Sequence, residues 1–250
     1  MTFKPDTGCK CDVRIAVNID DRAPHLSTDI LLLHYTGMES ADGALDWLCR
    51  KESKVSCHYF VYEDGRIVQS VPESRRAWHA GVSSWQGETD QNSRSIGIEI
   101  ANPGHEYGYP DFPEVQINAV IELCRDILDR NEILPRNVLA HSDVAPMRKA
   151  DPGEKFPWQK LHENGVGHWV PVQDGDGRQS LRLGDEGDCV SALQSGLSQY
   201  GYGVEITGSY NALTKACVVA FQRHFRQSNV DGIADVQTIA TLDALVSSVS

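Results

Sequence analysis

The sequence predicts an α/β domain, with a mixed β-sheet flanked by helices, followed by a small C-terminal three-helix bundle. In the first 160 residues, short apolar runs alternate with patterns of helical spacing. Residues 166–180 then change to a linker composition rich in Gly, Asp and Gln, and further helical patterns follow. The length of 250 residues exceeds the roughly 100–200 of one domain, so two domains fit better than one.

Short apolar runs predict the strands of the sheet. They lie at residues 13–17, 30–34, 58–62, 66–69 and 95–101. The second run is almost continuously apolar, which is typical of a strand buried on both faces. The turn sequence Glu63-Asp64-Gly65 separates the third run from the fourth and predicts a hairpin.

Two helices are expected to accompany these strands. Ser40 precedes an amphipathic stretch with one apolar face, formed by Ala44, Leu45, Leu48 and Cys49. Pro113 stands where a longer helix begins, and apolar residues follow at positions 117, 120, 121, 124, 127 and 128. This spacing is the strongest helical pattern in the chain.

The C-terminal part of the chain contains two similar segments. Residues 208–214 and 232–238 each begin with Gly, with Asn211 or Asp235 three residues later and Thr after three more. An N-cap explains this pattern, because its side-chain oxygen accepts from amide donors that the first helical turn leaves free. With a helix near residues 185–200, three helices result. We therefore expect a domain of residues 1–165, a flexible linker of residues 166–180 and a separately folding helical domain of residues 181–250.

Acidic residues dominate the charge of the chain. Asp and Glu number 35 against 23 Lys and Arg, and the net charge is −12. No basic stripe is present that would neutralise phosphates, so we expect no nucleic-acid partner. No apolar run approaches the ~20 residues of a membrane-spanning helix, so we expect no membrane span. We also expect no obligate protein partner.

The seven cysteines are odd in number and irregularly spaced. A disulfide framework is more typical of short chains with an even count, so we expect free thiols and a cytoplasmic location. A location in the periplasm or cell envelope is the alternative, if a leader has been removed. Cys9 and Cys11 suggest a metal or redox pair, but without a second pair two exposed thiols are the better interpretation.

Two histidines and one aspartate are candidate metal ligands. His34 ends the second apolar run, and His141 follows a further apolar run. Asp151 lies ten residues beyond His141, in a loop rich in Pro and Gly that can fold back. Two imidazoles and a carboxylate, with a fourth position open, form the ligand set of a hydrolytic zinc site. A histidine at a strand end is more often structural, so the spacing alone leaves both interpretations open.

Five segments follow one another within residues 10–165: LLLHYTG, CHYFVYEDGRIVQSV, AWHAGVSSW, SIGIEIANPG and HSDVAPMRKADPGEKFPW. In this order they resemble the zinc-dependent N-acetylmuramoyl-L-alanine amidases of the type-2 amidase family, especially its AmiD and AmpD branch. The last segment is the most specific. The tail, with LRLGDEGD, FQRHF and VDG, is similar to the peptidoglycan-binding domain that is often joined to such enzymes.

The resemblance implies a role for each matching residue. His34, His141 and Asp151 match the ligands of Zn²⁺. Glu99, in SIGIEI, matches the catalytic carboxylate, which takes a proton from the attacking water and hands it to the leaving amine. Lys149 matches a lysine that stabilises the oxyanion, with an ordinary surface lysine as the alternative.

Further residues match the family's substrate cleft or depart from its pattern. Trp78 and His79 match a segment that lines the cleft, and we expect Asn102 to donate to a peptide carbonyl. Simple packing of the aromatic residue and a turn role for Asn102 are the alternatives. Cys57 stands where some members have a tyrosine, so help from a tyrosine is not assumed. A cysteine nucleophile with His58 as base is a weak alternative, because adjacent strand residues point to opposite faces.

The resemblance implies the fold shared by type-2 amidases and peptidoglycan-recognition proteins, and a zinc hydrolase. Its substrates would be peptidoglycan or muropeptide fragments, in wall turnover or recycling. The bond cut would be the amide between N-acetylmuramic acid, or its anhydro form, and L-alanine of the stem peptide. The alternatives are a peptidoglycan receptor that binds without cutting, as in relatives that lack a zinc ligand, and a wall anchor, which leaves the ligand set unexplained.

Overall fold

The computed structural model describes residues 3–175 and 177–249; Met1, Thr2, Asp176 and Ser250 lie outside the described residues. Its strands are β1 (Cys11–Val13), β2 (Ile19–Asp21), β3 (Ile30–Tyr35), β4 (Tyr59–Val61), β5 (Ile67–Gln69), β6 (Arg75–Ala77), β7 (Ser95–Ile100) and β8 (Val138–Ala140). Its α-helices are α1 (Ala41–Cys49), α2 (Gln91–Arg94), α3 (Glu114–Arg130), α4 (His141–Val144), α5 (Trp158–Glu163), α6 (Asp188–Tyr200), α7 (Ala212–Phe225) and α8 (Val236–Ser248). Short 3₁₀ helices lie at Lys51–Ser53, His105–Tyr107 and Pro135–Asn137. Over these described ranges, no helix has the length and apolar character needed to cross a membrane.

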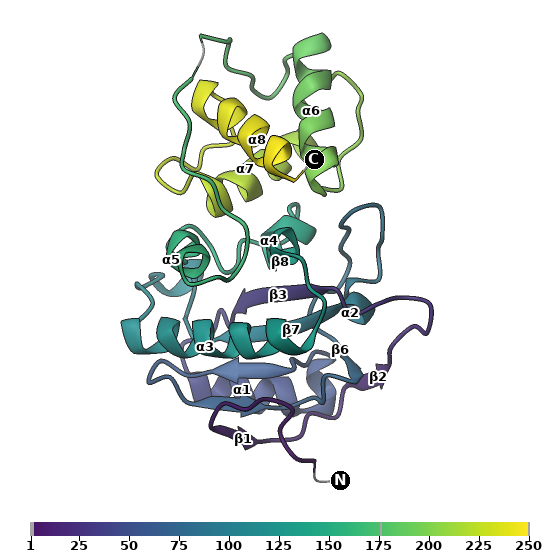
Figure 1. The fold of residues 1–250 in the computed structure, drawn as a ribbon, viewed down its shortest axis with the longest axis vertical. Helices are drawn as coiled ribbons and strands as arrows, with labels where there is room; N and C mark the ends of the chain where they lie inside the picture. The colour runs from purple at the N-terminus through teal and green to yellow at the C-terminus, as the bar shows by residue number, and fades with distance from the viewer. Residues whose placement is uncertain (1–2, 176, 250) are drawn as a thin grey trace.

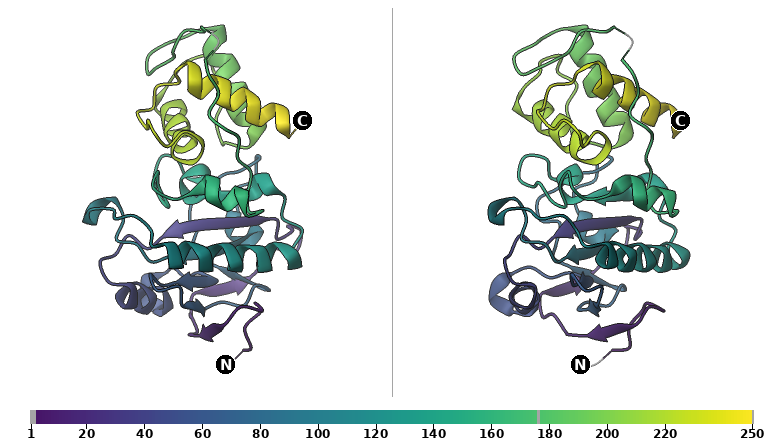
Figure 2. Two further views of the ribbon diagram at one scale, coloured as in Figure 1. Left: turned by 60° about the vertical axis from the view of Figure 1, so that its left-hand side comes forward. Right: turned by 90° about the vertical axis from the view of Figure 1, so that its left-hand side faces the viewer.

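A six-stranded mixed sheet forms the centre of the larger domain (Figure 1). Its strand order is β1-β5-β4-β7-β3-β8, in which β4 and β5 pair antiparallel and the other neighbours pair parallel. The helix α3 packs on one face and α1 on the other, so the sheet lies between two helical layers (Figures 1 and 2). The predicted α/β class is confirmed.

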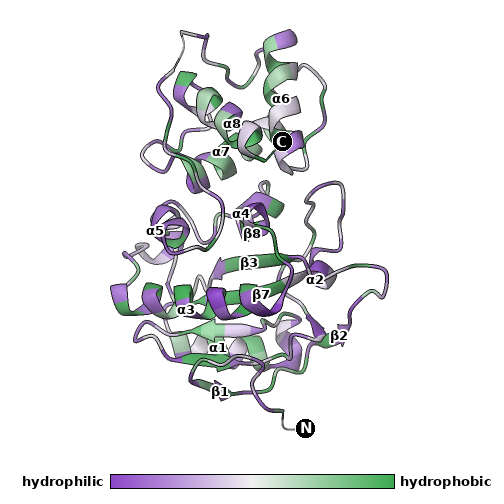
Figure 3. Ribbon diagram, in the orientation of Figure 1, coloured by the Kyte–Doolittle hydropathy of each residue, from purple (hydrophilic) through white to green (hydrophobic). Residues whose placement is uncertain are grey.

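Most of the predicted strands form with small changes at their ends. The hairpin is present as β4 and β5, and the apolar strands β3 and β7 cross the middle of the sheet (Figure 3). The prediction for residues 13–17 is wrong in its bounds, because β1 ends at Val13 and only single backbone hydrogen bonds continue from Arg14 and Ala16. The antiparallel pair of β2 and β6 was not predicted, since their sequences IDD and RRA are charged and lack apolar alternation.

The two helices of the larger domain begin where the sequence predicts. The hydroxyl of Ser40 accepts from the backbone N of Gly43 at 3.1 Å and caps α1. The longer α3 begins directly after Pro113. It buries one face in a cluster with β3, β4 and β7, through Ile117, Val120, Ile121, Cys124 and Ile127. Its opposite side is hydrophilic (Figure 3).

The three C-terminal helices form the expected bundle, and both predicted caps are confirmed. The side-chain oxygen of Asn211 accepts from Thr214 N at 3.0 Å at the start of α7. The carboxylate of Asp235 accepts in the same way from Thr238 N at 2.9 Å at the start of α8. The repeated Gly-to-Thr pattern is therefore a pair of helix starts.

The bundle packs directly on the larger domain, and both contribute to one apolar cluster (Figure 1). The larger domain supplies Ile30, Leu32, Trp85, Leu139 and Val144, among others. The bundle supplies residues that include Tyr200, Tyr202, Phe221 and Phe225. Trp85 is fully buried, and its ring meets those of Tyr200 and Tyr202 edge-on, at centroid distances of 6.0 and 5.2 Å. The two domains thus share a core, which we call the shared cluster.

The segment predicted as a flexible linker is held by contacts in its described part. The ring nitrogens of His168 lie 2.8 Å from the hydroxyl of Tyr200 and 2.9 Å from that of Ser248. The backbone N of Gln173 donates to the hydroxyl of Thr241 at 3.1 Å. With the shared cluster, these contacts hold the described part of this segment and the bundle against the larger domain, whereas the sequence predicts a flexible tether. Separate folding of the bundle stays a prediction. The domain boundaries themselves stay predictions.

Candidate metal centre and cleft

The predicted ligands come from neighbouring elements of the larger domain. His34 lies near the carboxyl end of β3, and His141 is the first residue of α4, directly after β8. Because β3 and β8 pair in parallel, their carboxyl ends meet at the same edge of the sheet. Asp151 returns to this edge from the loop after α4, where its carbonyl oxygen accepts from Ser142 N at 3.0 Å.

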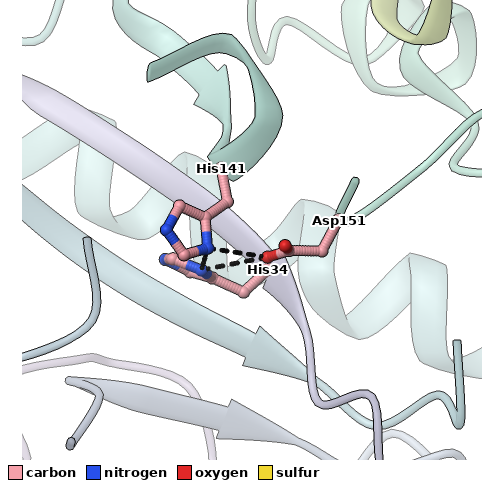
Figure 4. Close-up of side chains that lie close together, drawn as sticks. All are labelled: His34, His141 and Asp151. Carbon is pink, nitrogen blue, oxygen red and sulfur yellow. Dashed lines mark hydrogen bonds and ion pairs between the residues drawn. The ribbon is translucent and has the colours of Figure 1, made fainter. Parts of the chain in front are cut away.

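The ligand atoms face one another (Figure 4). Nδ1 of His34 lies 2.9 Å from Nδ1 of His141 and 3.2 Å from Oδ2 of Asp151. Nδ1 of His141 lies 3.0 Å from the same carboxylate oxygen. Ligands at about 2.0–2.1 Å from a tetrahedral zinc ion are about 3.3 Å apart, so this triangle has the shape of a zinc site and is slightly tighter. The donor set fits zinc with one position open.

Burial and mutual attraction set the charges of these side chains. The exposed fractions of His34, His141 and Asp151 are 1%, 3% and 6%. Burial, together with the neighbouring His141, lowers the pKa of His34 to about 4 and keeps its imidazole neutral near pH 7. Burial acts to raise the pKa of Asp151, but attraction to His141 and hydrogen bonding with both imidazoles outweigh it and lower that pKa. The cluster therefore favours a positive charge between its members, either a proton or a metal ion.

The outer nitrogens of both histidines have hydrogen-bond partners. Nε2 of His141 lies 3.1 Å from the carbonyl oxygen of Ala80, to which it donates. Nε2 of His34 lies 3.0 Å from Nδ1 of His79. A neutral imidazole has one N–H, so placing it on Nε2 leaves an unprotonated Nδ1 that points to the centre. This is the form in which histidine binds a metal.

The contacts of His79 determine which of its nitrogens faces His34. The hydroxyl of Ser95 donates its hydrogen to the carbonyl oxygen of Gln91 at 2.5 Å, so it accepts from Nε2 of His79 at 3.3 Å. Nδ1 of His79 is then free to accept from His34. The ring lies directly over Gly97, where an added Cβ would be 2.5 Å away. Sequence reasoning missed this support, although Gly inside the strand sequence SIGIEI indicates close approach of another group.

Glu99 lies on the same face of the sheet as the ligand from β3. In the parallel pair of β3 and β7, Glu99 is opposite His34. Its Oε2 is buried, and within the described residues it has no hydrogen-bond partner. Burial and the negative charge of Asp151 raise the pKa of Glu99 well above its ordinary value, against the attraction of Lys149. An unpartnered carboxylate with a raised pKa is suited to accept a proton.

Two adjoining hollows of about 540 and 450 Å³ open onto the centre. Both are lined by Val55, Trp78, His79, His141, Arg148 and Lys149. The larger hollow also takes in the carboxylates of Glu99, Glu106 and Asp151. The smaller hollow adds Lys54 and Arg76, and no acidic residue is among its described lining residues. His141 thus lines both a hollow of mixed charge and a basic one, which we call the mixed hollow and the basic hollow.

The structure places Lys149, Trp78 and His79 along this cleft. The indole N–H of Trp78 donates to the carboxylate of Asp20 at 2.8 Å, which fixes the ring at the rim. The ring nitrogens of His79 contact neighbouring side chains of the protein. Direct contact of these residues with a substrate stays a prediction.

Asn102 has an observed role in the loop beyond β7. Its side-chain nitrogen donates to the carbonyl oxygen of Pro110 at 3.0 Å, and its side-chain oxygen accepts from Gly104 N at 2.9 Å. Both ends of the amide therefore hold the loop of residues 103–110, which borders the cleft. This matches the turn role, and the predicted bond to a peptide carbonyl is not tested by these contacts.

The geometry gives no support to a cysteine nucleophile. Cys57 is fully buried, and burial together with Glu99 raises the pKa of its thiol well above the ordinary value. Nδ1 of His58 accepts from Gly97 N at 2.9 Å, and its Nε2 lies 3.0 Å from the carbonyl oxygen of Arg75. A protonated thiol beside a fully engaged imidazole is not an activated nucleophile.

Two sequence families match the chain. The profile of the family described as N-acetylmuramoyl-L-alanine amidase matches residues 24–154, which include all three candidate ligands and Glu99. The profile of a peptidoglycan binding domain matches residues 186–242, which span most of the bundle. The two matches coincide with the two parts of the structure.

Individual proteins match over nearly the whole chain. The N-acetylmuramoyl-L-alanine amidase AmiD of Escherichia coli K12 is 39% identical over 229 residues, which cover 87% of this chain and 82% of that protein. The solved complex of E. coli AmiD with anhydro-N-acetylmuramic acid-L-Ala-D-γ-Glu-L-Lys superposes with a TM-score of 0.78 at 36% identity, covering 92% of this chain and 98% of that one. The structure of AmpDh3 of Pseudomonas aeruginosa in complex with anhydromuramic pentapeptide superposes with a TM-score of 0.74 at 32% identity. The match covers 91% of this chain and 94% of that one.

Proposed function

Because this chain belongs to the family of N-acetylmuramoyl-L-alanine amidases, we propose that its cluster of two histidines and one aspartate is a zinc centre. The chain is a hydrolase that cleaves the amide bond between N-acetylmuramic acid and L-alanine of peptidoglycan. The proposal depends on one observation, the convergence of His34, His141 and Asp151, whose ligand atoms lie within 4.8 Å of one another. Zinc at this position would polarise the scissile carbonyl and lower the pKa of a water.

Glu99 and Lys149 supply the remaining chemistry in this proposal. The carboxylate of Glu99 accepts a proton from the attacking water and returns it to the nitrogen of L-alanine as the C–N bond breaks. The ammonium of Lys149, on the wall shared by both hollows, faces the oxygen on which negative charge develops. One such charge contributes about 10²–10³ in rate.

Charge favours one orientation of the substrate in the cleft. In a muropeptide the lactyl carboxyl is part of the amide bond, whereas γ-linked glutamate leaves a free carboxylate on the stem peptide. We therefore place the stem peptide in the basic hollow, near Lys54, and the sugar in the mixed hollow, near Trp47. The ligands in the AmiD and AmpDh3 complexes support a muropeptide, including its anhydro form, as the substrate.

The bundle and the cysteines support two further parts of the proposal. The match to a peptidoglycan binding domain supports a second attachment to wall material, which raises the local substrate concentration.

All seven cysteines are free thiols, as in a reducing compartment, which supports the cytoplasm over the alternative of the envelope. Sequencing the N-terminus of native protein from fractionated cells distinguishes the two locations.

Metal analysis followed by product analysis tests the proposed function. We expect the purified full-length chain to hold about one zinc ion by emission spectrometry. We also expect it to release free stem peptide from a soluble muropeptide, to lose this activity with a chelator and to regain it with added zinc. Binding without release would indicate the receptor alternative. Full activity of the metal-free protein would rule out the zinc mechanism.

A further inference from the structure

The C-terminal bundle contacts the helical turn that carries the ligand His141. This turn, α4, has four residues and is too short to be stable by itself. Its Asp143 is fully buried. The carboxylate of Asp143 accepts three hydrogen bonds, from Ala140 N at 2.8 Å, the Tyr202 hydroxyl at 2.7 Å and Nδ1 of His224 at 2.7 Å. The last two donors belong to the bundle.

Packing holds both of these donors in position. The ring of His224 stacks between Trp158 and Phe225, at centroid distances of 3.7 and 3.9 Å. The ring of Tyr202 meets Trp85 edge-on at 5.2 Å within the shared cluster. Neither donor can turn to another partner without disturbing the packing between the domains.

The shared cluster also includes the residue that accepts the hydrogen bond from Nε2 of His141. The carbonyl oxygen of Ala80 accepts from His141, and the methyl group of Ala80 belongs to the shared cluster. In the same loop, Ser84 N donates to the carbonyl oxygen of Val144, the last residue of α4. The bundle therefore packs against both the turn that carries His141 and the loop that orients its imidazole.

The bundle does not line the cleft within the described residues, since both hollows are lined by residues up to Asp151. Its contacts with α4 therefore reach the centre through protein groups rather than through substrate. We propose that the helical domain is a structural part of the metal centre, in which Tyr202 and His224 position Asp143 and, through it, His141. This inference rests on the zinc centre proposed above. Because coupling is reciprocal, bound zinc then also strengthens the docking of the bundle.

The substitution Tyr202→Phe tests this inference in the full-length chain, because it removes one hydroxyl and keeps the ring. Tyr210→Phe is the matched control. The Tyr210 hydroxyl donates to the carbonyl oxygen of Gly232 at 3.0 Å inside the bundle, and Tyr210 is as buried as Tyr202. Zinc dissociation constants are measured by chelator competition. We expect an increase of about tenfold for Tyr202→Phe, typical of losing a partner behind a metal ligand, and less than twofold for Tyr210→Phe.

The zinc-induced rise in the unfolding midpoint provides a second readout, and it should be smaller for Tyr202→Phe than for Tyr210→Phe. Equal zinc affinities in the two variants would overturn the inference while leaving the zinc centre intact. A wild-type chain that binds no zinc would overturn both proposals. If Tyr202→Phe does not fold, the variants His224→Leu and His224→Asn replace it. Only asparagine keeps a donor for the carboxylate of Asp143, so His224→Leu should bind zinc more weakly than His224→Asn. Equal zinc affinities of these two variants would also overturn the inference.

Discussion

Replacing Glu99 by glutamine separates proton transfer from metal binding. The amide has nearly the shape of the carboxylate but cannot accept a proton from water. The affected oxygen, Oε2 of Glu99, has no hydrogen-bond partner among the described residues, so Glu99→Gln breaks no bond made by that atom. We therefore expect the variant to fold, to retain zinc and to bind substrate.

The expected loss for Glu99→Gln falls on kcat. A positioned general base contributes about 10²–10⁴ in rate, which corresponds to about 3–5 kcal/mol of transition-state stabilisation. The upper part of this range is expected, because the carboxylate is buried and has no other partner at Oε2. Since substrate contacts do not change, KM should remain within a few-fold of the wild-type value.

The assay measures initial rates of stem-peptide release from one soluble muropeptide, at matched zinc content for both proteins. Glu122→Gln is the matched control, because it makes the same change of side chain at an exposed residue that lines neither hollow. A rate for Glu99→Gln near that of the wild type would refute the role of Glu99 as base. Loss of zinc from the variant would instead make Glu99 part of the metal centre.

Three other perturbations test the metal, the shared cluster and the linker. Asp151→Ala removes the one anionic ligand, and emission spectrometry should find no bound zinc in the purified variant. Trp85→Ala should lower the free energy of unfolding by about 3–5 kcal/mol, because its side chain is buried in the core that both domains share. Calorimetry of the wild-type chain should show a single transition, and two separate transitions there would contradict a shared core. Burial lowers the pKa of His168 to about 4, so the unfolded chain takes up its proton first and stability is lost as the pH falls from about 6.5 to about 4. Urea midpoints across this range should fall less in His168→Gln, and an equal fall would show that His168 does not contribute.

The sequence predicted those helices and strands that are determined by residues close to one another along the chain. The hairpin, the start of α3 and the two capped helices of the bundle each depend on residues within a few positions of one another. The pair of β2 and β6 escaped prediction because each strand has three residues and charged side chains. Local sequence patterns were therefore sufficient to predict the fold class and most of the longer helices.

The site was predicted in part. Spacing alone left open whether His34, His141 and Asp151 are metal ligands, and the resemblance to a family favoured that role. The structure brings the three side chains together, and their binding of a metal stays a proposal. The support of His34 by His79 was not predicted, because it depends on a contact through space over Gly97. Short polar contacts between distant segments leave no periodic pattern in a sequence.

The packing of the two domains against one another was not predicted from the sequence. The linker composition of residues 166–180 suggested independence, and nothing in the local pattern indicated that Trp85 packs against Tyr200 and Tyr202. A cut near Gly175 would expose these rings on both fragments. Whether two domains fold independently depends on which residues each large apolar side chain packs against, and composition does not reveal those contacts.

The shared cluster also sets an order of events during synthesis. The amidase part leaves the ribosome before the bundle, so Trp85 and its apolar neighbours stay uncovered until the helices of the bundle have been translated. At about 5–20 residues per second, the roughly 70 residues of the bundle need about 4–14 s. During this interval the nascent chain presents an apolar patch to its surroundings, so we expect it to be a client of ribosome-associated chaperones until its last helix has docked.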